Sequence, residues 1–308
     1  MPVPEEFRQL ARKVNNWGRW GEEDELGTLN LITPEVVKRG AACIKKGKTF
    51  SLALLLSEDG PQTGAIPGRA NPARTMTAIN APMTPDRPEP RMSDDAVSMG
   101  LQAATHWDSL AHVSFEGRIY NGNNAASIDE DGAGKCGIEN VETLVSRGVL
   151  LDVARAKGVD RLEPGYAIGP EDLDAAEEIT GTTVSPGDVV LLRTGHVQIL
   201  KEGRKKNYGS PSPGPSMACA LWFRERDVAA VATDNLTFEV YPGKSDEIAF
   251  PVHVLNLVEM GLLQGQNFDL EDLAENCAND GVYEFFLEAS PEPFVGGLGS
   301  PVNPVAIK

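Results

Sequence analysis

The sequence predicts an α/β fold with a mixed β-sheet at its core and helices flanking the sheet. Three nearly continuous apolar runs, each bounded by turn residues, are typical of strands that are buried on both faces; they lie at 148–154, 185–195 and 228–235. Amphipathic segments with helical spacing alternate with these runs. That alternation is the pattern of α/β units, so part of the sheet is expected to be parallel.

The N-terminal third begins with a short amphipathic helix over 5–14 and a second helix over 33–46. Thr33 and Pro34 suit the start of the second helix, and Gly47 suits its end. A strand is predicted over 49–56. The stretch 57–97 contains seven prolines, which break any long helix, and it is too long for a simple connection. We expect it to be an ordered excursion with a strand around 74–79; whether it forms a lid stays open.

The rest of the chain alternates helices with the buried runs. Helices are predicted over 138–147, 169–181, 216–226, 251–261 and 269–279, and a further strand over 281–290. The tail, 295–307, ends in apolar residues that we expect to dock on the body, because they would otherwise be exposed to water. We therefore predict one domain over 1–308, with an N-terminal extension (1–50) and the proline-rich excursion (57–97).

Composition excludes several classes of protein. The 45 acidic and 28 basic residues give a net charge of −17, and nucleic acids and anionic membranes both require clustered positive charge. No apolar run approaches the roughly 20 residues that span a bilayer, and no secretory signal is visible. The four cysteines are scattered, as in a reduced, cytoplasmic protein. A small-molecule substrate is the expected partner.

The segment 102–112 carries the strongest chemical signal, because it holds two of the four histidines in the chain. If 98–105 continues as a strand, Gln102, His106 and Asp108 point to one face, and Trp107 to the other. His112 follows Asp108 by four residues and is within reach if the chain turns. An amide, imidazoles and a carboxylate in one row can hold a divalent metal or orient a water.

This segment resembles the His-x-Gly-Thr-His-x-Asp-x-Pro-x-His signature of the cyclase family, whose best-known members are bacterial kynurenine formamidases and isatin hydrolases. Four positions match: Thr105, His106, Asp108 and His112. Three depart from it: Gln102 stands at the first His, Ala104 at the Gly and Leu110 at the Pro. The resemblance extends from about Trp17 to the C-terminus and implies the cyclase-family fold, usually in homo-oligomers, here a homodimer or homotetramer.

The resemblance also implies a second group of metal ligands, a His followed about thirteen residues later by Glu-Asn. His253 matches the His, and Gln266-Asn267 stand at the Glu-Asn. Glutamine therefore replaces two metal ligands, Gln102 and Gln266, and an amide oxygen is a poor ligand for zinc or manganese. Two interpretations stay open: one Zn or Mn ion on His106 and Asp108, helped by His253 or Gln102, and a site without metal.

In the metal interpretation, the resemblance implies a hydrolase of C–N or ester bonds that acts on a small cyclic or aryl amide, lactam or lactone. His112 would move a proton from water to the leaving group. In the metal-free interpretation, His106 or His112 paired with Asp108 is the base of a hydrolase, or of a lyase, dehydratase or cyclase. A third hypothesis, from a different class, is a non-catalytic small-molecule-binding relative.

Three further residues are candidate substrate-binding residues beside Gln102. They are Trp17 in a Gly- and Trp-rich segment, Trp107 within the motif, and His196 after the buried run that ends at Gly195. Each also has a structural interpretation, since buried tryptophan and histidine side chains are usual in protein cores.

Overall fold

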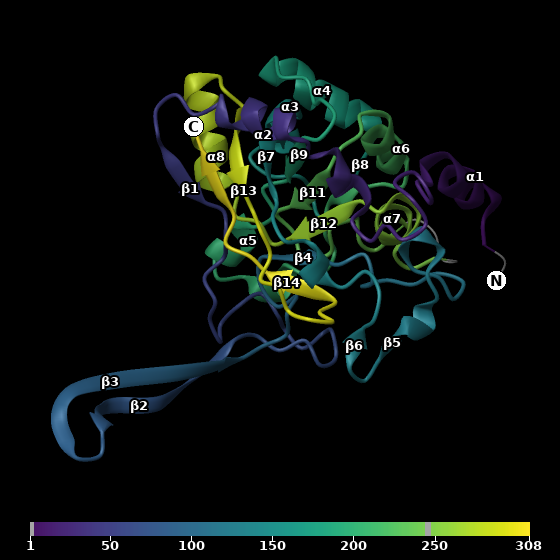
Figure 1. Ribbon diagram of the computed structural model, residues 1–308. Coiled ribbons are helices and arrows are strands. Elements are labelled where there is room, and N and C mark those ends of the chain that lie inside the picture. The colour runs from purple at the N-terminus through teal and green to yellow at the C-terminus, as the bar shows by residue number, and fades with distance from the viewer. Residues whose placement is uncertain (1–2, 244–247) are drawn as a thin grey trace.

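A nine-stranded mixed sheet organises the molecule (Figure 1). The computed structural model describes residues 3–243 and 248–308; the first two residues of the predicted N-terminal extension lie outside them. The strand order is β1-β15-β13-β7-β9-β11-β12-β4-β14. The strands are β1 (Thr49–Ser51), β4 (His106–Asp108), β7 (Val145–Asp152), β9 (Val189–Arg193), β11 (Ala230–Thr233), β12 (Leu263–Gln266), β13 (Glu284–Glu288), β14 (Gly299–Pro301) and β15 (Val305–Ile307).

The four central strands, β7, β9, β11 and β12, run parallel, and the strands outside them pair antiparallel. The predicted mixed sheet is thus confirmed, and the three apolar runs form its centre. Alternate residues of these strands enter two separate hydrophobic clusters: Leu150 and Leu191 pack on one face, Val149 and Val190 on the other. Burial on both faces explains why the runs lack polar alternation.

Helices cover both faces of the sheet. They are α1 (Glu5–Val14), α2 (Pro34–Ala41), α3 (Val153–Ala156), α4 (Pro170–Thr180), α5 (Gln198–Lys201), α6 (Ala218–Glu225), α7 (Pro251–His253), which continues as a π-helix over Val254–Met260, and α8 (Glu271–Asp280). Short 3-10 turns occupy Gly27–Leu31, Tyr120–Gly122, Ala125–Ser127, Ile138–Asn140 and Lys205–Asn207. Two small strand pairs complete the body: β5 (Ile128–Asp129) with β6 (Gly132–Ala133), and β8 (Ala167–Ile168) with β10 (Gly214–Pro215).

Two local predictions were wrong. The expected helix over 138–147 is only one 3-10 turn, and Val145 already begins β7, where it pairs with Glu288 of β13; pairing with a distant strand overrides local helix propensity. The expected strand over 98–105 is irregular after residue 98, with turns and bends over 101–105 and the Ala103 N–H donating to the Gly100 carbonyl at 3.0 Å. Regular pairing begins only at His106.

The proline-rich stretch contains a long hairpin, β2 (Ala73–Thr84) with β3 (Arg87–Ser98), which projects away from the body (Figure 1). It is much longer than the strand expected around 74–79. The predicted docking of the tail is confirmed, because β14 and β15 are both part of the main sheet. Across residues 3–243 and 248–308, no helix is both long and apolar enough to span a bilayer.

Candidate functional site

The site is built on the antiparallel pair β4 and β12. Gln264 lies opposite Asp108, and Gln266 lies opposite His106. Directly opposed residues share a face of a sheet, and so do alternate residues of one strand. Two amides, an imidazole and a carboxylate are therefore held together on one face, although Asp108 and Gln264 are 156 residues apart along the chain.

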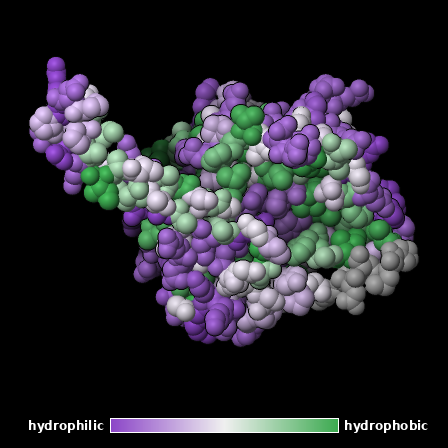
Figure 2. All heavy atoms as spheres, turned by 90° about the horizontal axis from the view of Figure 1, so that it is seen from below, coloured by the Kyte–Doolittle hydropathy of each residue, from purple (hydrophilic) through white to green (hydrophobic). Residues whose placement is uncertain are grey.

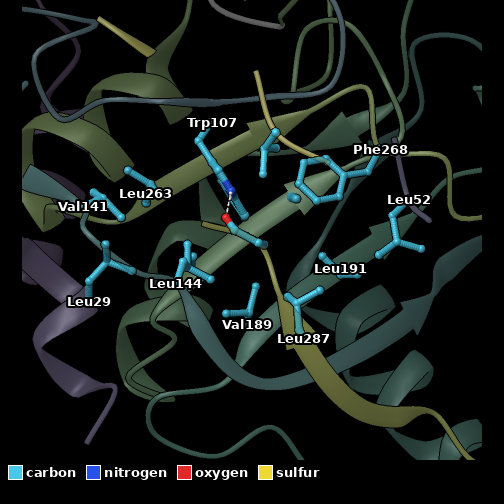
Figure 3. Packing of buried hydrophobic residues seen from close by; sticks show 14 of the residues in the cluster. Leu29, Leu52, Trp107, Val141, Leu144, Val189, Leu191, Leu263, Phe268 and Leu287 are labelled. Carbon is cyan, nitrogen blue, oxygen red and sulfur yellow. Dashed lines mark hydrogen bonds between the residues drawn. The ribbon is translucent and has the colours of Figure 1, made fainter. Parts of the chain in front are cut away.

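The opposite face of the same strands belongs to the core. Trp107 is fully buried, packs edge-on against Phe268, and donates its indole N–H to the Ala289 carbonyl at 2.8 Å (Figure 3). A Cβ on its neighbour Gly265 would lie 2.8 Å from the Trp107 and Phe268 rings, so only glycine permits this packing. Its ring points away from the Asp108 side because strand side chains alternate, so the structure gives no contact that supports the predicted role of Trp107 in binding substrate.

Three histidines surround the Asp108 carboxylate. His106 Nε2 lies 3.3 Å and His112 Nε2 3.7 Å from Asp108 Oδ1, while His253 Nε2 lies 4.0 Å from Oδ2. The turn at 109–112, with the His112 N–H donating to the Ser109 carbonyl at 3.0 Å, returns His112 to the carboxylate. Only His112 is partly open to solvent, with 21% of its side chain exposed.

Hydrogen bonds on the far side of the rings fix two tautomers. His106 Nδ1 lies 2.7 Å from the Ala104 carbonyl, and His253 Nδ1 lies 2.6 Å from the Glu239 carboxylate. Both Nδ1 atoms must therefore carry the proton, which leaves each Nε2 lone pair facing Asp108. Glu239 is itself held by the N–H groups of Val252 and His253 at the start of α7.

This arrangement leaves two buried acceptors facing each other. His106 Nε2 and Asp108 Oδ1 have no hydrogen-bond partner among the described residues, although a buried polar atom without a partner costs free energy. Two lone pairs 3.3 Å apart are stabilised by a proton or a cation between them. The position between His106 and Asp108, beside His112, is therefore where a reacting water or an ion would be held.

The electrostatics favour an ionised carboxylate beside a neutral imidazole. Burial alone would raise the pKa of Asp108, but the attraction of its carboxylate to the neighbouring His112 and His106 rings outweighs burial, so the pKa is lowered. Burial lowers the pKa of His112, against the opposing pull of Asp108. At neutral pH, His112 is consequently unprotonated and able to accept a proton.

The two sides of the carboxylate differ in how they suit a metal. On the Oδ2 side, the Gln266 amide donates to Asp108 at 2.7 Å and lies 3.4 Å from His253 Nε2. Its N–H groups fill the space that an ion shared by those two atoms would need. On the Oδ1 side, imidazole and carboxylate offer free lone pairs, the donors that zinc or manganese accepts.

The residues thus fit one ion on His106 and Asp108, with His112 beside it, and the proposed ligand His253 is separated from that position by Gln266. No group of three His, Cys, Asp or Glu side chains within 3–243 and 248–308 is arranged as a complete metal site. Gln264 donates to Asp108 Oδ2 at 3.2 Å and accepts from Asn256, so this amide too supports the carboxylate rather than an ion.

A second layer of hydrogen bonds supports His106. Asn267 donates to the Ala104 carbonyl at 3.0 Å, the same carbonyl that holds His106. The Tyr208 hydroxyl donates to Asn267 at 2.9 Å, and His196 lies 2.8 Å from the Tyr208 carbonyl. His196 is fully buried, and among the described residues this chain of contacts connects it to the site, so a role in binding substrate stays a prediction.

The other two proposed residues, Gln102 and Trp17, lie outside strands β4 and β12. Gln102 is in a turn rather than on a strand, and its amide approaches β14 so closely that a Cβ on Gly299 would be 2.7 Å from its nitrogen. Trp17 donates to the Val258 carbonyl on the π-helix at 2.7 Å, and no hydrogen bond joins it to the histidine cluster in the part of the chain described. We find no contact that supports a substrate-binding role for Trp17.

One residue that the sequence analysis missed is Arg69, in the irregular part of the 57–97 stretch. Its side chain packs against Gly100, shortly before the motif. Burial lowers the pKa of Arg69 while Asp108 opposes that change, and its positive charge helps to lower the pKa of His112. Neither periodicity nor a motif marks this arginine, because only the fold brings the loop to the site.

The match to a family model is the first of the comparisons with known proteins. The model described as putative cyclase matches residues 48–240. No curated protein matches the chain. A crystal structure described as a novel cyclase is 38% identical, covers 96% of this chain and 100% of its own, and superposes with a TM-score of 0.88.

Two structures of isatin hydrolase A are similar at lower identity. The enzyme from Labrenzia aggregata, bound to benzyl benzoate, is 20% identical with a TM-score of 0.62, and the match covers 84% of this chain and 93% of that one. The enzyme from Ralstonia solanacearum is 21% identical with a TM-score of 0.63, covering 90% and 98%. These likenesses show the shared fold, and the predicted family is confirmed: the chain belongs to the putative cyclase family.

Proposed function

We propose that this chain is a hydrolase of small cyclic or aryl carbonyl compounds, namely amides, lactams or lactones. The observation that carries the proposal is the pair of unpartnered lone pairs on His106 Nε2 and Asp108 Oδ1, next to a neutral, partly exposed His112. Such an arrangement can hold one water by hydrogen bonds with a base beside it. The isatin hydrolases that share the fold support a hydrolytic reaction.

His112 is the general base in this proposal. Its Nε2 takes a proton from the water, whose oxygen forms a bond to the substrate carbonyl carbon. Asp108 remains ionised, and its Oδ1, 3.7 Å from His112 Nε2, stabilises the imidazolium by its opposite charge. His112 then returns the proton to the departing nitrogen or oxygen as its bond to the carbonyl carbon breaks, which restores the base.

The remaining residues orient the Asp108 carboxylate and the His106 ring, and they stabilise negative charge on the substrate. Hydrogen bonds from Gln264 and Gln266 fix the Asp108 carboxylate, and the Ala104 carbonyl fixes the His106 ring. The charge of Arg69, which also lowers the pKa of His112, favours negative charge on the substrate oxygen. A zinc or manganese ion on His106 and Asp108, when bound, would polarise the carbonyl and lower the pKa of water.

The Gln266 contact favours a second candidate, a lyase, dehydratase or cyclase that works without metal. An amide that bridges Asp108 and His253 stabilises the carboxylate without any ion. His112 would then remove a proton from the substrate itself rather than from water. The two candidates predict different atoms in the product, because only hydrolysis adds the elements of water.

Turnover of a substrate panel tests the proposal. We expect the wild type to hydrolyse a cyclic imide, an aryl lactone or an N-formyl aniline. His112→Ala should lower kcat by about 10²–10⁴-fold, the usual contribution of a general base. Calorimetry should show unchanged affinity for a non-hydrolysable analogue. Ser114→Ala, at an exposed residue two positions after His112, is the control and should keep full activity. Full turnover by His112→Ala would refute the assignment of the base, and binding without any turnover by the wild type would favour the non-catalytic relative.

A further inference from the structure

Arg69 is a half-buried arginine without a partner of its own. Among the described residues its guanidinium forms no hydrogen bond and no ion pair, and burial is the largest influence on its pKa, which is lowered. Arg147 and Arg193 are buried further, yet each binds two carboxylates. Charged side chains are rarely buried unless they are paired. Arg69 is therefore suited to a counter-charge that a ligand brings.

A closed loop holds Arg69 in place. The Gln62 N–H donates to Asn71 Oδ1 at 2.9 Å, and Asn71 Nδ2 donates to the Gln62 carbonyl at 2.9 Å, so these two residues close the loop 62–71. Within the loop, the Arg69 N–H donates to the Ile66 carbonyl at 3.2 Å. The loop ends just before the β2–β3 hairpin, which stands apart from the body in Figures 1 and 2. Contacts of the loop itself, and not of the hairpin, thus keep Arg69 against the body.

The same loop is attached to the segment that leads into His106. The Gln62 side chain is buried and donates to the Ala103 carbonyl at 2.9 Å. A Cβ on Gly100 would lie 3.3 Å from Arg69 Cγ, so the stem of the arginine rests on the backbone of that segment. A side chain whose stem is already fixed loses little conformational entropy when it binds a ligand.

The charge of Arg69 acts on the candidate site without being neutralised there. It disfavours protonation of His112 and is attracted to Asp108, and such effects require that the guanidinium be near both groups. No ion pair joins Arg69 to Asp108, whose carboxylate accepts hydrogen bonds from Gln264 and Gln266 instead. The N–H donors of Arg69 therefore stay available near the general base.

We propose that Arg69 binds a carboxylate carried by the substrate, so that the compound hydrolysed beside His112 is a cyclic or aryl carbonyl compound with an acid group. This inference rests on the proposed function. A guanidinium offers two parallel N–H donors that match the two oxygens of a carboxylate. Among the described residues, no lysine or second arginine joins Arg69 in the main influences on His112. One cation balances a carboxylate, whereas a doubly charged phosphate calls for more.

Calorimetry with three acid and amide pairs tests the proposal without requiring turnover. The probes are benzoate, phenylacetate and 3-phenylpropanoate, each compared with its neutral amide on protein treated with a chelator. We expect the wild type to bind at least one acid about tenfold more tightly than its amide, as a hydrogen bond between charged groups provides. Arg69→Met should remove this preference. Arg69→Lys keeps the charge but not the two parallel donors, so it should retain part of the preference.

Arg91→Met is the matched control. It removes the same charge from an exposed arginine on the β2–β3 hairpin, so it should keep the full preference for the acid. A preference that survives in Arg69→Met would overturn the proposal, and so would a wild type that prefers none of the acids. An equal loss in Arg91→Met would reduce the effect to net charge and would also overturn it. If Arg69→Met does not fold, Arg69→Lys decides against the same control.

Steady-state kinetics separates this inference from the proposed function. N-formyl aniline and the three N-formylaminobenzoates share the reacting amide and differ by the carboxylate. Arg69→Met should raise KM about tenfold for at least one of the acids and leave KM for N-formyl aniline unchanged, while any fall in kcat should be shared by all four substrates. An unchanged KM for every acid would contradict the anchor. If the wild type hydrolyses none of them, the proposed function fails, and the calorimetric preference still decides on Arg69.

Discussion

Replacing Gln266 with Glu tests how the site is held together, because it restores a carboxylate where the family signature has a metal ligand. In the wild type, the Gln266 amide donates to Asp108 at 2.7 Å and faces His253 Nε2 at 3.4 Å. Gln266→Glu removes both donors and adds a negative charge against a buried carboxylate. Without a cation the variant should be less stable, and with a cation it should recover.

The size of the effect follows from these contacts. Losing a hydrogen bond to a charged acceptor costs about 1.5–3 kcal/mol. Two unit charges about 4 Å apart at an effective dielectric of 20 repel by about 4 kcal/mol, although the pair can limit this cost by sharing a proton. We expect a loss of about 2–4 kcal/mol in the free energy of unfolding at pH 7. The loss should shrink as the pH falls, because protonation neutralises one carboxyl.

Urea denaturation with and without zinc or manganese measures both the loss of stability in Gln266→Glu and its recovery when an ion binds. An ion at about 100 times its dissociation constant should return about 2.7 kcal/mol to Gln266→Glu. Gln264→Glu is the matched control: it places the same charge beside Asp108 Oδ2 but away from His253, so it should be destabilised without recovery. Equal stability of Gln266→Glu and wild type without metal, or equal recovery of both glutamate variants, would refute this reasoning.

Other predictions concern the base, its surroundings and the core. Because burial lowers the pKa of His112 from 6.5, and a base acts unprotonated, a pH–rate profile should be flat at neutral pH and fall in acid with a midpoint below 6.5. Arg69→Met removes a charge that disfavours the imidazolium, so the same profile should move to higher pH. Trp107→Phe leaves the Ala289 carbonyl unpaired and should cost about 1–3 kcal/mol in denaturation without changing KM; a raised KM would place the indole at the substrate. Asn267→Ala breaks two buried hydrogen bonds and should lower both stability and kcat; unchanged kcat would remove it from the support of His106.

The sequence was sufficient for the parts of the fold that local chemistry determines. Thr33 and Pro34 begin α2 as predicted. The apolar runs form the parallel strands, because a strand that is buried on both faces has a nearly continuous apolar sequence. The helix predicted from 138 failed because pairing with β13, more than 130 residues away, decides the conformation of 145–147. Local propensity contains no information about such a partner.

In the candidate site, too, local features could be predicted from the sequence and features that depend on distant strand pairing could not. His106, Asp108 and His112 come together because short spacing within one segment limits where they can go. Gln264 could not be predicted, since its role depends on the register in which β12 pairs with β4. Trp107 was placed on the correct face by strand alternation but was assigned to substrate, because the sequence does not say which face is the core.

Product analysis after reaction in water enriched in heavy oxygen tests the central claim most directly. If His112 activates a water held beside His106 and Asp108, mass spectrometry should find one heavy oxygen in the new carboxylate of every product molecule. His112→Ala should form that labelled product far more slowly. A product with no heavy oxygen, formed at the full rate by the wild type, would contradict hydrolysis and leave proton removal from the substrate as the reaction of this site.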